Sequence, residues 1–219
     1  MPELKNQRLL WRRFINIKYL IISVLALLLT ACASAPGKMS SATKDSDVSP
    51  VMVVKKNYKI SASVEQQFGY GIEAMSAEDY LQAIEIFNKV AEKEPRASGP
   101  WVNIAIAYRK LDQIDKADEA IETAVKLNPS NPYALNQAGI IKREKGEFEA
   151  AQSMYKSALA EYPNYANAHL NLAILCDLYL QKIVCAKSHY QAYQEIEKND
   201  DKQVIAWMSD LSRRESQIK

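Results

Sequence analysis

Hydrophobic and polar positions divide the chain into four stretches of different character. Residues 1–18 are basic and lead into an apolar run of eleven residues, Tyr19–Leu29, which contains a single serine. Residues 33–60 are rich in Ser, Ala, Lys and Asp and have no helical period. From residue 61 onward apolar positions recur regularly, among many helix-favouring residues. The pattern therefore predicts an N-terminal segment, a polar tether and a helical body.

The helical body repeats itself every 34 residues. Three residue types mark the period, and each returns at the same place in successive units. They are Pro95, Pro129 and Pro163; Ala83, Ala117 and Ala151; and Ile72, Ile106, Ile140 and Ile174. A proline pushes the residue before it out of helical geometry, so each proline ends a unit. A period of this length predicts stacked helix pairs that bury their apolar faces against one another.

The second unit carries the fullest motif. It reads Trp101-x2-Ile104-Ala105-x2-Tyr108, followed by Ala117, Ile121, Ala124 and Pro129. This motif resembles the tetratricopeptide repeat (TPR), and the resemblance covers about residues 64–198. It implies an all-α fold, a TPR solenoid of about four helix-turn-helix repeats. In such a fold small residues let two helices approach closely, and large residues fill the gaps between helices.

The fourth unit departs from this pattern. After a regular start it is one residue too long, and its packing positions fit only with a one-residue insertion near Gln181. The tail that follows has apolar residues at helical spacing, namely Val204, Ile205, Met208 and Leu211. Because a solenoid needs a cover for its open end, we expect an array over residues 61–198 and a C-terminal capping helix and tail over residues 199–219.

The apolar run at the N-terminus ends at a cysteine between small residues. A helix needs about 20 apolar residues to span a bilayer, so this run is short for a transmembrane helix. A basic segment, a short apolar core and small residues are typical of a secretory signal. Leu29-Thr30-Ala31-Cys32 also resembles the lipobox of bacterial lipoproteins. The resemblance implies a lipoprotein signal peptide over residues 1–31, cleaved before a lipidated Cys32, and the alternative is an uncleaved anchor helix.

The segment after the signal peptide, residues 32–60, is then a lipidated cysteine with a flexible tether. Several acyl chains on one cysteine make a stable membrane anchor. A flexible linker of this length has an end-to-end span of about 30 Å, which lets the folded body stand clear of the bilayer. Ala33 is not the aspartate that typically retains lipoproteins in the inner membrane. In a Gram-negative cell the resemblance therefore implies the outer membrane, with the protein facing the periplasm.

Charge and motif content argue against several classes of function. Without the five basic residues and one acidic residue of the signal peptide, 23 Lys and Arg stand against 25 Asp and Glu. A chain so balanced has no basic stripe for nucleic acid. The sequence contains no CxxC or HExxH metal motif. We therefore expect no enzyme activity, metal, cofactor, nucleic acid or small-molecule substrate, and keep an envelope enzyme with a cryptic site as an alternative.

Two histidines and two cysteines lie in the fourth unit. His169 replaces the aromatic residue at the start of the unit, which favours a packing role, and His189 has no clear partner in the sequence. Cys176 and Cys185 lie nine residues apart on opposite sides of the helix turn. In the oxidising periplasm an available pair forms a disulfide, but the geometric demands are strict. The sequence leaves two alternatives open: a disulfide, or two buried thiols that pack as small hydrophobes.

The first helices of TPR arrays line a concave face, and the family resemblance gives the positions that face a ligand. The ninth position is isoleucine in all four units, and the sixth is an amide in the second, third and fourth units. Amide side chains offer donors and acceptors to a peptide backbone. The candidate peptide-binding residues are Phe68, Ile72, Val102, Asn103, Ile106, Arg109, Asn136, Gln137, Ile140, Arg143, Leu170, Asn171 and Ile174. The alternative is that the isoleucines pack against neighbouring helices.

These features predict a non-enzymatic periplasmic adaptor that is anchored in the membrane through the Cys32 lipid and binds a protein or an extended peptide in its groove. The family includes outer-membrane lipoproteins that pilot pilus secretins to the membrane, and others that scaffold peptidoglycan-remodelling enzymes. The resemblance does not choose between these roles, and a purely structural lipoprotein is a further alternative.

Overall fold

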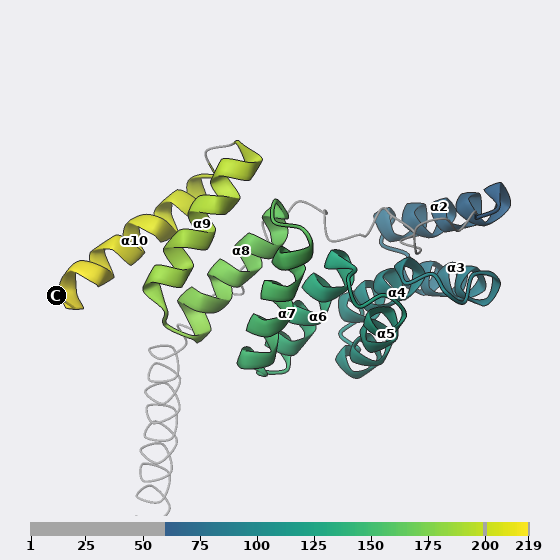
Figure 1. The fold of residues 1–219 in the computed structure, drawn as a ribbon. Helices are drawn as coiled ribbons and strands as arrows, with labels where there is room; N and C mark the ends of the chain where they lie inside the picture. The colour runs from purple at the N-terminus through teal and green to yellow at the C-terminus, as the bar shows by residue number, and fades with distance from the viewer. Residues whose placement is uncertain (1–59, 199–200, 219) are drawn as a thin grey trace, which may run out of the picture. The chain divides into compact units, whose positions relative to one another are not determined.

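The repeat period appears in the structure as a row of helix pairs (Figure 1). The computed structural model describes residues 60–198 and 201–218, so the predicted signal peptide, Cys32 and nearly all of the predicted tether lie outside the described residues. In chain order the helices are α2 (Ala62–Ser76), α3 (Tyr80–Lys93), α4 (Gly99–Lys110), α5 (Ile114–Leu127), α6 (Pro132–Glu144), α7 (Phe148–Glu161), α8 (Ala166–Ile174), the π-helix η1 (Leu175–Tyr179), α9 (Ile183–Glu197) and α10 (Lys202–Ile218).

Each repeat unit forms a hairpin of two helices. Helix α2 packs on α3, α4 on α5, α6 on α7 and α8 on α9, and each hairpin packs on the next one along the chain. The first helices of successive units also contact one another directly, α4 with α6 and α6 with α8. The expected all-α TPR solenoid is therefore confirmed.

Small residues allow the two helices of a hairpin to approach closely. A Cβ atom at Gly71 on α2 would lie 2.6 Å from Cε1 of Phe87 on α3. One repeat further on, a Cβ atom at Gly139 would lie 2.5 Å from Cε1 of Tyr155. Both aromatic side chains are fully buried. The expected division of labour, in which a glycine leaves room that a large side chain fills, is thus observed at these two places.

The turns inside the hairpins locate the extra residue of the fourth unit. Glu78, Asp112 and Gly146 have positive φ and are 34 residues apart, whereas the matching residue of the fourth turn is Gln181, 35 residues after Gly146. In the second unit the amide after the positive-φ residue donates to a carbonyl five positions earlier, Gln113 N to Tyr108 O at 2.9 Å. In the fourth unit the corresponding bond reaches six positions back, from Lys182 N to Cys176 O at 2.8 Å.

The π-helix η1 absorbs this insertion just before the turn. Its hydrogen bonds join residues five positions apart, such as Leu180 N to Leu175 O at 3.0 Å, so each turn holds one more residue than a turn of α-helix. The rest of α8 and all of α9 therefore keep the register of the other repeats. The sequence-based insertion near Gln181 is confirmed, and in the structure the extra residue is accommodated by the π-helix Leu175–Tyr179.

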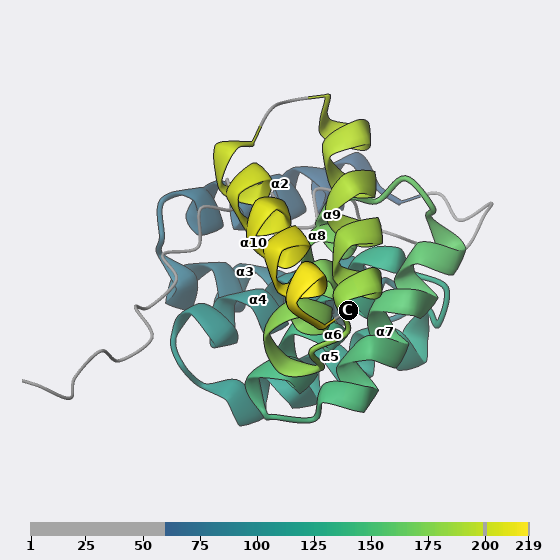
Figure 2. The same ribbon diagram turned by 90° about the vertical axis from the view of Figure 1, so that its left-hand side faces the viewer.

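Helix α10 covers the last repeat. It lies alongside α9, as the view in Figure 2 shows. Val204 and Leu211 are buried in this contact, and Trp207 packs on Tyr190 with ring centroids 5.5 Å apart. Ile205, which the helical spacing grouped with them, is instead 45% exposed. The face of α10 that packs on the last repeat is therefore narrower than the spacing of its apolar residues predicts.

Candidate functional site

The predicted isoleucine row lies in the core of the array. Ile106 is 1% exposed, Ile140 3% and Ile174 8%, and each belongs to a buried apolar cluster. Ile72, on the first helix of the array, is partly buried and packs on the same core. The expectation of an exposed apolar stripe is therefore wrong for the second, third and fourth units.

The reason lies in how the first helices are surrounded. Helix α4 contacts α3, α5 and α6, and helix α6 contacts α4, α5, α7 and α8. A helix packed on so many sides has little surface left to present to a ligand. The fifth-position side chains share this burial, and they are Phe68, Val102, Asn136 and Leu170.

The predicted row of amide side chains is partly occupied by hydrogen bonds that join one repeat to the next. Asn171 Nδ2 on α8 donates to Asn136 Oδ1 on α6 at 3.1 Å, and Asn136 Nδ2 lies 3.5 Å from the Tyr165 hydroxyl. Asn103 and Gln137, on α4 and α6, are also buried. Because a buried amide is costly unless it is hydrogen-bonded, the Asn136–Asn171 bond ties the third repeat to the fourth.

The two arginines at the twelfth position lie nearer the surface. Arg109 Nη1 on α4 is 3.2 Å from Glu144 Oε1 at the end of α6, with the two side chains 16% and 35% exposed. This ion pair partly neutralises the positive charge that Arg109 would otherwise offer to an acidic peptide. Arg143 on α6 is partly exposed. Of the candidate groove residues, Ile72, Arg109 and Arg143 are those with accessible side-chain surface in the structure.

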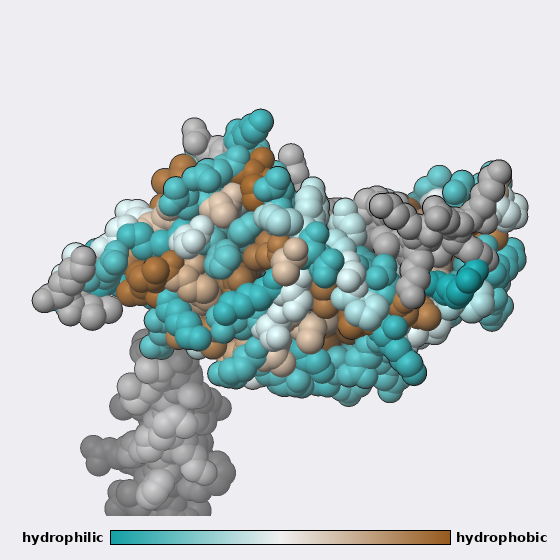
Figure 3. Space-filling model, viewed as in Figure 1, coloured by the Kyte–Doolittle hydropathy of each residue, from teal (hydrophilic) through white to brown (hydrophobic). Residues whose placement is uncertain are grey.

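Exposed apolar side chains gather instead around the turn between η1 and α9. Leu178 is 53% exposed, Tyr179 45% and Val184 76%, and we call these three residues the η1 surface. Tyr179 also packs on Phe148 at the start of α7, with ring centroids 4.7 Å apart. On the face seen in Figure 3, hydrophobic areas over α9 and α10 are small and lie among hydrophilic ones. The sequence signal for this surface was the irregular turn of the fourth unit.

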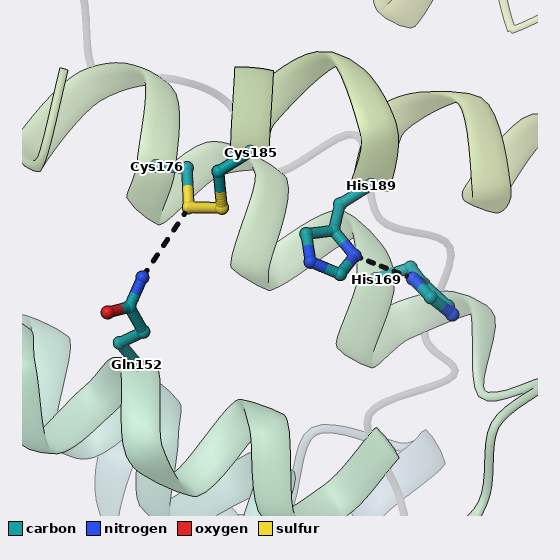
Figure 4. Close-up of a disulfide and its surroundings, with 5 residues drawn as sticks. All are labelled: Gln152, His169, Cys176, Cys185 and His189. Atoms are coloured by element: carbon teal, nitrogen blue, oxygen red, sulfur yellow. Dashed lines mark hydrogen bonds between the residues drawn. A yellow bond between two sulfur atoms is a disulfide. The ribbon is translucent and has the colours of Figure 1, made fainter. Parts of the chain in front are cut away.

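The two cysteines of the fourth repeat form a disulfide. It joins Cys176 on η1 to Cys185 on α9, with Cα atoms 5.9 Å apart, and Figure 4 shows the bridge between the two helices. Gln152 Nε2 on α7 lies 3.8 Å from Cys176 Sγ. Of the two alternatives that the sequence left open, the structure contains the bridge. It fixes the irregular turn to α9.

An ionic cluster that the sequence did not indicate joins the second repeat to the third. The buried carboxylate of Asp118 on α5 accepts a short hydrogen bond from Lys145 Nζ and lies 3.1 Å from Lys142 Nζ on α6. Burial acts to raise the pKa of Asp118, but the hydrogen bonds and charges of Lys145 and Lys142 together lower it below its usual value. The arrangement is typical of a structural ion pair, because both cations act on one carboxylate.

Two further features bear on the kind of site to expect. Within residues 60–198 and 201–218, no three or more His, Cys, Asp or Glu side chains come together in a way that holds a metal ion. None of the helices described for this chain combines the length and apolarity that crossing a bilayer requires.

Comparison with known proteins recognises the same repeats. Two family models, each described as a tetratricopeptide repeat, match residues 74–136 and 136–177. A TPR repeat-containing protein of Methanocaldococcus jannaschii is 35% identical over 85 residues, which cover 39% of this chain and 15% of that protein. The protein O-mannosyl-transferase TMTC3 of Mus musculus is 32% identical over 171 residues, which cover 71% of this chain and 18% of that protein. The chain thus spans less than a fifth of the length of either relative.

Solved structures show the same fold. A structure of Pseudomonas aeruginosa pilF superposes with a TM-score of 0.64 at 21% identity, covering 71% of this chain and 70% of that chain. At this level of identity the likeness concerns the fold. Together with the family models, it supports a chain built of tetratricopeptide repeats.

Proposed function

We propose that the protein is a lipid-anchored adaptor of the bacterial envelope, attached to the outer membrane through Cys32 and facing the periplasm. In this role it binds a protein partner through its repeat array during envelope assembly, either in pilus secretin biogenesis or in the scaffolding of cell-wall enzymes. The lipobox-like Leu29-Thr30-Ala31-Cys32 supports the anchor. The repeat fold supports the adaptor.

The observation that carries the proposal is the coincidence of an irregular repeat with an exposed apolar surface. Repeats of regular length do not require a π-helix, and single π-helical turns inside α-helices occur frequently at functional sites. Leu178, Tyr179 and Val184 lie within seven positions of one another on the two sides of this turn. Exposed apolar residues that gather in one place mark interaction surfaces more often than scattered ones do. We therefore place the partner contact at the η1 surface, with the accessible groove residues Ile72, Arg109 and Arg143 as the second candidate surface.

Site-specific photo-crosslinking in living cells tests both surfaces. A photoreactive amino acid is placed at Val184 for the η1 surface, at Arg143 for the groove, and at Leu81 on α3 as a matched control. Val184 and Leu81 are comparably exposed, at 76% and 69%. We expect one discrete adduct from Val184 and none from Leu81, with mass spectrometry of the adduct deciding between a secretin and a cell-wall enzyme. Adducts from Arg143 alone would move the contact to the groove, and equal adducts from all three positions would contradict a specific adaptor.

Metabolic labelling tests the anchor independently. In the Cys32→Ser variant the thiol that carries the diacylglycerol is absent, so radiolabelled palmitate should not be incorporated and the protein should be released or misprocessed. The wild-type chain grown in parallel should carry the label. Palmitate on the Cys32→Ser protein would overturn the lipoprotein proposal without affecting the crosslinking result.

A further inference from the structure

Two histidines from different helices of the fourth repeat meet through one nitrogen each. His169 Nδ1 on α8 lies 2.9 Å from His189 Nδ1 on α9, and the ring centroids are 5.1 Å apart (Figure 4). Both side chains are partly exposed, so an ion can reach the pair from solvent. The two residues are 20 positions apart, and no short sequence motif contains both. The fold therefore brings together two nitrogen ligands that the sequence keeps separate.

The other ring nitrogen of His169 holds the ring in the state that a metal ligand needs. His169 Nε2 lies 2.9 Å from the carbonyl oxygen of Pro163, in the loop before α8. A carbonyl can only accept, so Nε2 carries a proton, and a neutral His169 has its lone pair on Nδ1. Metal-binding histidines commonly donate their other N–H to a backbone carbonyl, which fixes the tautomer and the orientation of the ring. The lone pair of His169 is thus held toward His189.

The separation of the two Nδ1 atoms fits one transition-metal ion. At metal–nitrogen distances of about 2.0–2.1 Å, two ligands at a right angle to each other lie about 3 Å apart. Right-angled positions belong to the tetragonal geometry of Cu(II) and Ni(II), and imidazole is a suitable ligand for both. Because the nitrogens are already 2.9 Å apart, the rings need only turn to aim both lone pairs at one ion, while the helices stay in place.

We propose that His169 and His189 form a binding site for a divalent transition-metal ion, each through Nδ1, with Cu(II) bound more tightly than Ni(II) or Zn(II). This order is the general one for divalent metals at nitrogen ligands. In the metal-free pair a neutral His169 accepts a hydrogen bond from His189 Nδ1–H. On binding, that proton moves to Nε2 of His189, so both rings stay neutral and no net proton is released. The site lies beyond the proposed adaptor function and does not depend on it.

The rest of the coordination shell is solvent. In the part of the chain that the structure describes, no third His, Cys, Asp or Glu side chain completes the cluster. We therefore expect water at the remaining positions and an affinity in the micromolar range. Because the two ligands come from α8 and α9, a bound ion joins the helices of the fourth hairpin and stabilises the folded chain by mass action.

Copper titration of the full chain in nonionic detergent, followed by electron paramagnetic resonance, tests the site. We expect a single Cu(II) ion whose spectrum shows nitrogen coupling from two imidazoles. His169→Gln and His189→Gln should each weaken binding by at least about 10-fold, since the loss of an outer-shell partner alone costs that much in metal sites. Wild-type affinity in both variants would place the copper elsewhere on the chain and overturn the proposal, as would the lack of micromolar binding to the wild type.

Nuclear magnetic resonance with isotope-labelled histidine gives a test that needs no substitution in the site. The chain contains only two histidines, and Zn(II) is diamagnetic, so both rings can be followed through a titration. We expect Nδ1 of both rings to move together to metal-bound shifts, with a proton on Nε2 of each. A shift in one ring only, or in neither, would overturn the proposal even if the glutamine variants do not fold.

Charge variants locate the ion without touching its ligands. The Lys156 ammonium on α7 is exposed and acts on His189, so it should also repel a bound cation. Lys156→Gln should therefore tighten Cu(II) binding by about 2- to 5-fold, the range expected for an exposed charge. Lys126→Gln on α5 removes an exposed charge two repeats away and should leave the affinity unchanged. Equal tightening in both variants would show a general charge effect and would contradict a site at this pair.

Discussion

At the residue scale, adding one methyl group at either of two nearby glycines of α2 should change the stability of the chain in opposite directions. Gly71 and Gly69 both lie inside this helix, where glycine is unfavourable relative to alanine by about 0.5–1 kcal/mol. A Cβ atom at Gly69 would meet nothing within 4 Å, but one at Gly71 would lie 2.6 Å from the Phe87 ring. We expect Gly69→Ala to stabilise the chain by about 0.5–1 kcal/mol. Gly71→Ala should destabilise it by about 1–3 kcal/mol, because the buried ring has to shift.

Equilibrium denaturation of the two single variants checks this prediction. They share a helix, a change of residue and a gain in helix propensity, so their difference reports the contact with Phe87. Equal shifts in the free energy of unfolding would show that the hairpin can relax around an added methyl group. The sequence allowed this contact to be foreseen, because the glycine and the aromatic residue stand at family positions whose roles are purely steric.

The isoleucine row shows that a repeat pattern alone does not predict whether a residue is buried or exposed. An apolar residue that recurs every 34 positions satisfies a buried contact between first helices and an exposed binding stripe equally well. Only the positions of neighbouring helices separate the two cases, and they place Ile106 and Ile140 in the core. The Asn136–Asn171 hydrogen bond was hidden for the same reason, since an amide that serves a ligand and one that serves the next repeat look alike in sequence.

At the element scale, the turns within the hairpins impose a backbone geometry that glycine meets best. Gln181 has a φ of +52° in the fourth turn, and Gly146 has a φ of +79° at the matching place in the third. A left-handed conformation costs a non-glycine residue about 1–2 kcal/mol. We therefore expect Gln181→Gly to raise the free energy of unfolding by up to about 1 kcal/mol and Gly146→Gln to lower it by about 1–2 kcal/mol.

Thermal denaturation followed by circular dichroism measures both exchanges. The two positions are exposed, so neither exchange alters buried packing. A loss of stability in Gln181→Gly would mean that the irregular turn relies on the Gln181 side chain and that its backbone is under no strain. That outcome would bear on the η1 surface, whose residues flank this turn.

The length of the fourth unit was readable from the sequence, but the way in which the helix absorbs the extra residue was not. Counting positions predicts an insertion near Gln181 and leaves open whether a loop bulges or a helix widens. In the structure the helix becomes a π-helix over Leu175–Tyr179, and this geometry places Cys176 opposite Cys185. The sequence left a disulfide and two free thiols open because it does not show which way these residues face.

At the scale of the whole array, stability depends on how the open end is closed. In a solenoid each repeat contacts only its neighbours, so the last repeat relies on its cap. Helix α10 provides the cap with buried Val204 and Leu211 and with two ion pairs, Lys187–Glu215 at 2.8 Å and Arg214–Asp177. The apolar spacing of the tail predicted this helix. The ion pairs were not predictable, because they join residues 28 and 37 positions apart.

The pair between Arg214 and Asp177 gives the sharpest test of the cap. Asp177 on η1 is 6% exposed, and Arg214 on α10 donates a short hydrogen bond to its carboxylate, which raises the pKa of the arginine. Replacing Arg214 by Gln leaves a buried carboxylate without its counter-charge, which is strongly destabilising where both partners are buried. Because the Arg214 side chain is 39% exposed and solvent screens part of the pair, we expect a loss of about 1–3 kcal/mol.

Arg213→Gln is the matched control, since its partner Asp210 lies on the same helix and both side chains are well exposed, so its cost should be close to zero. Hydrogen exchange on the two variants locates the effect: with Arg214→Gln, protection should fall in α9, α10 and η1 before it falls in α2–α5. Uniform loss of protection along the array would show that the repeats unfold as one unit and that the cap stabilises all of them equally.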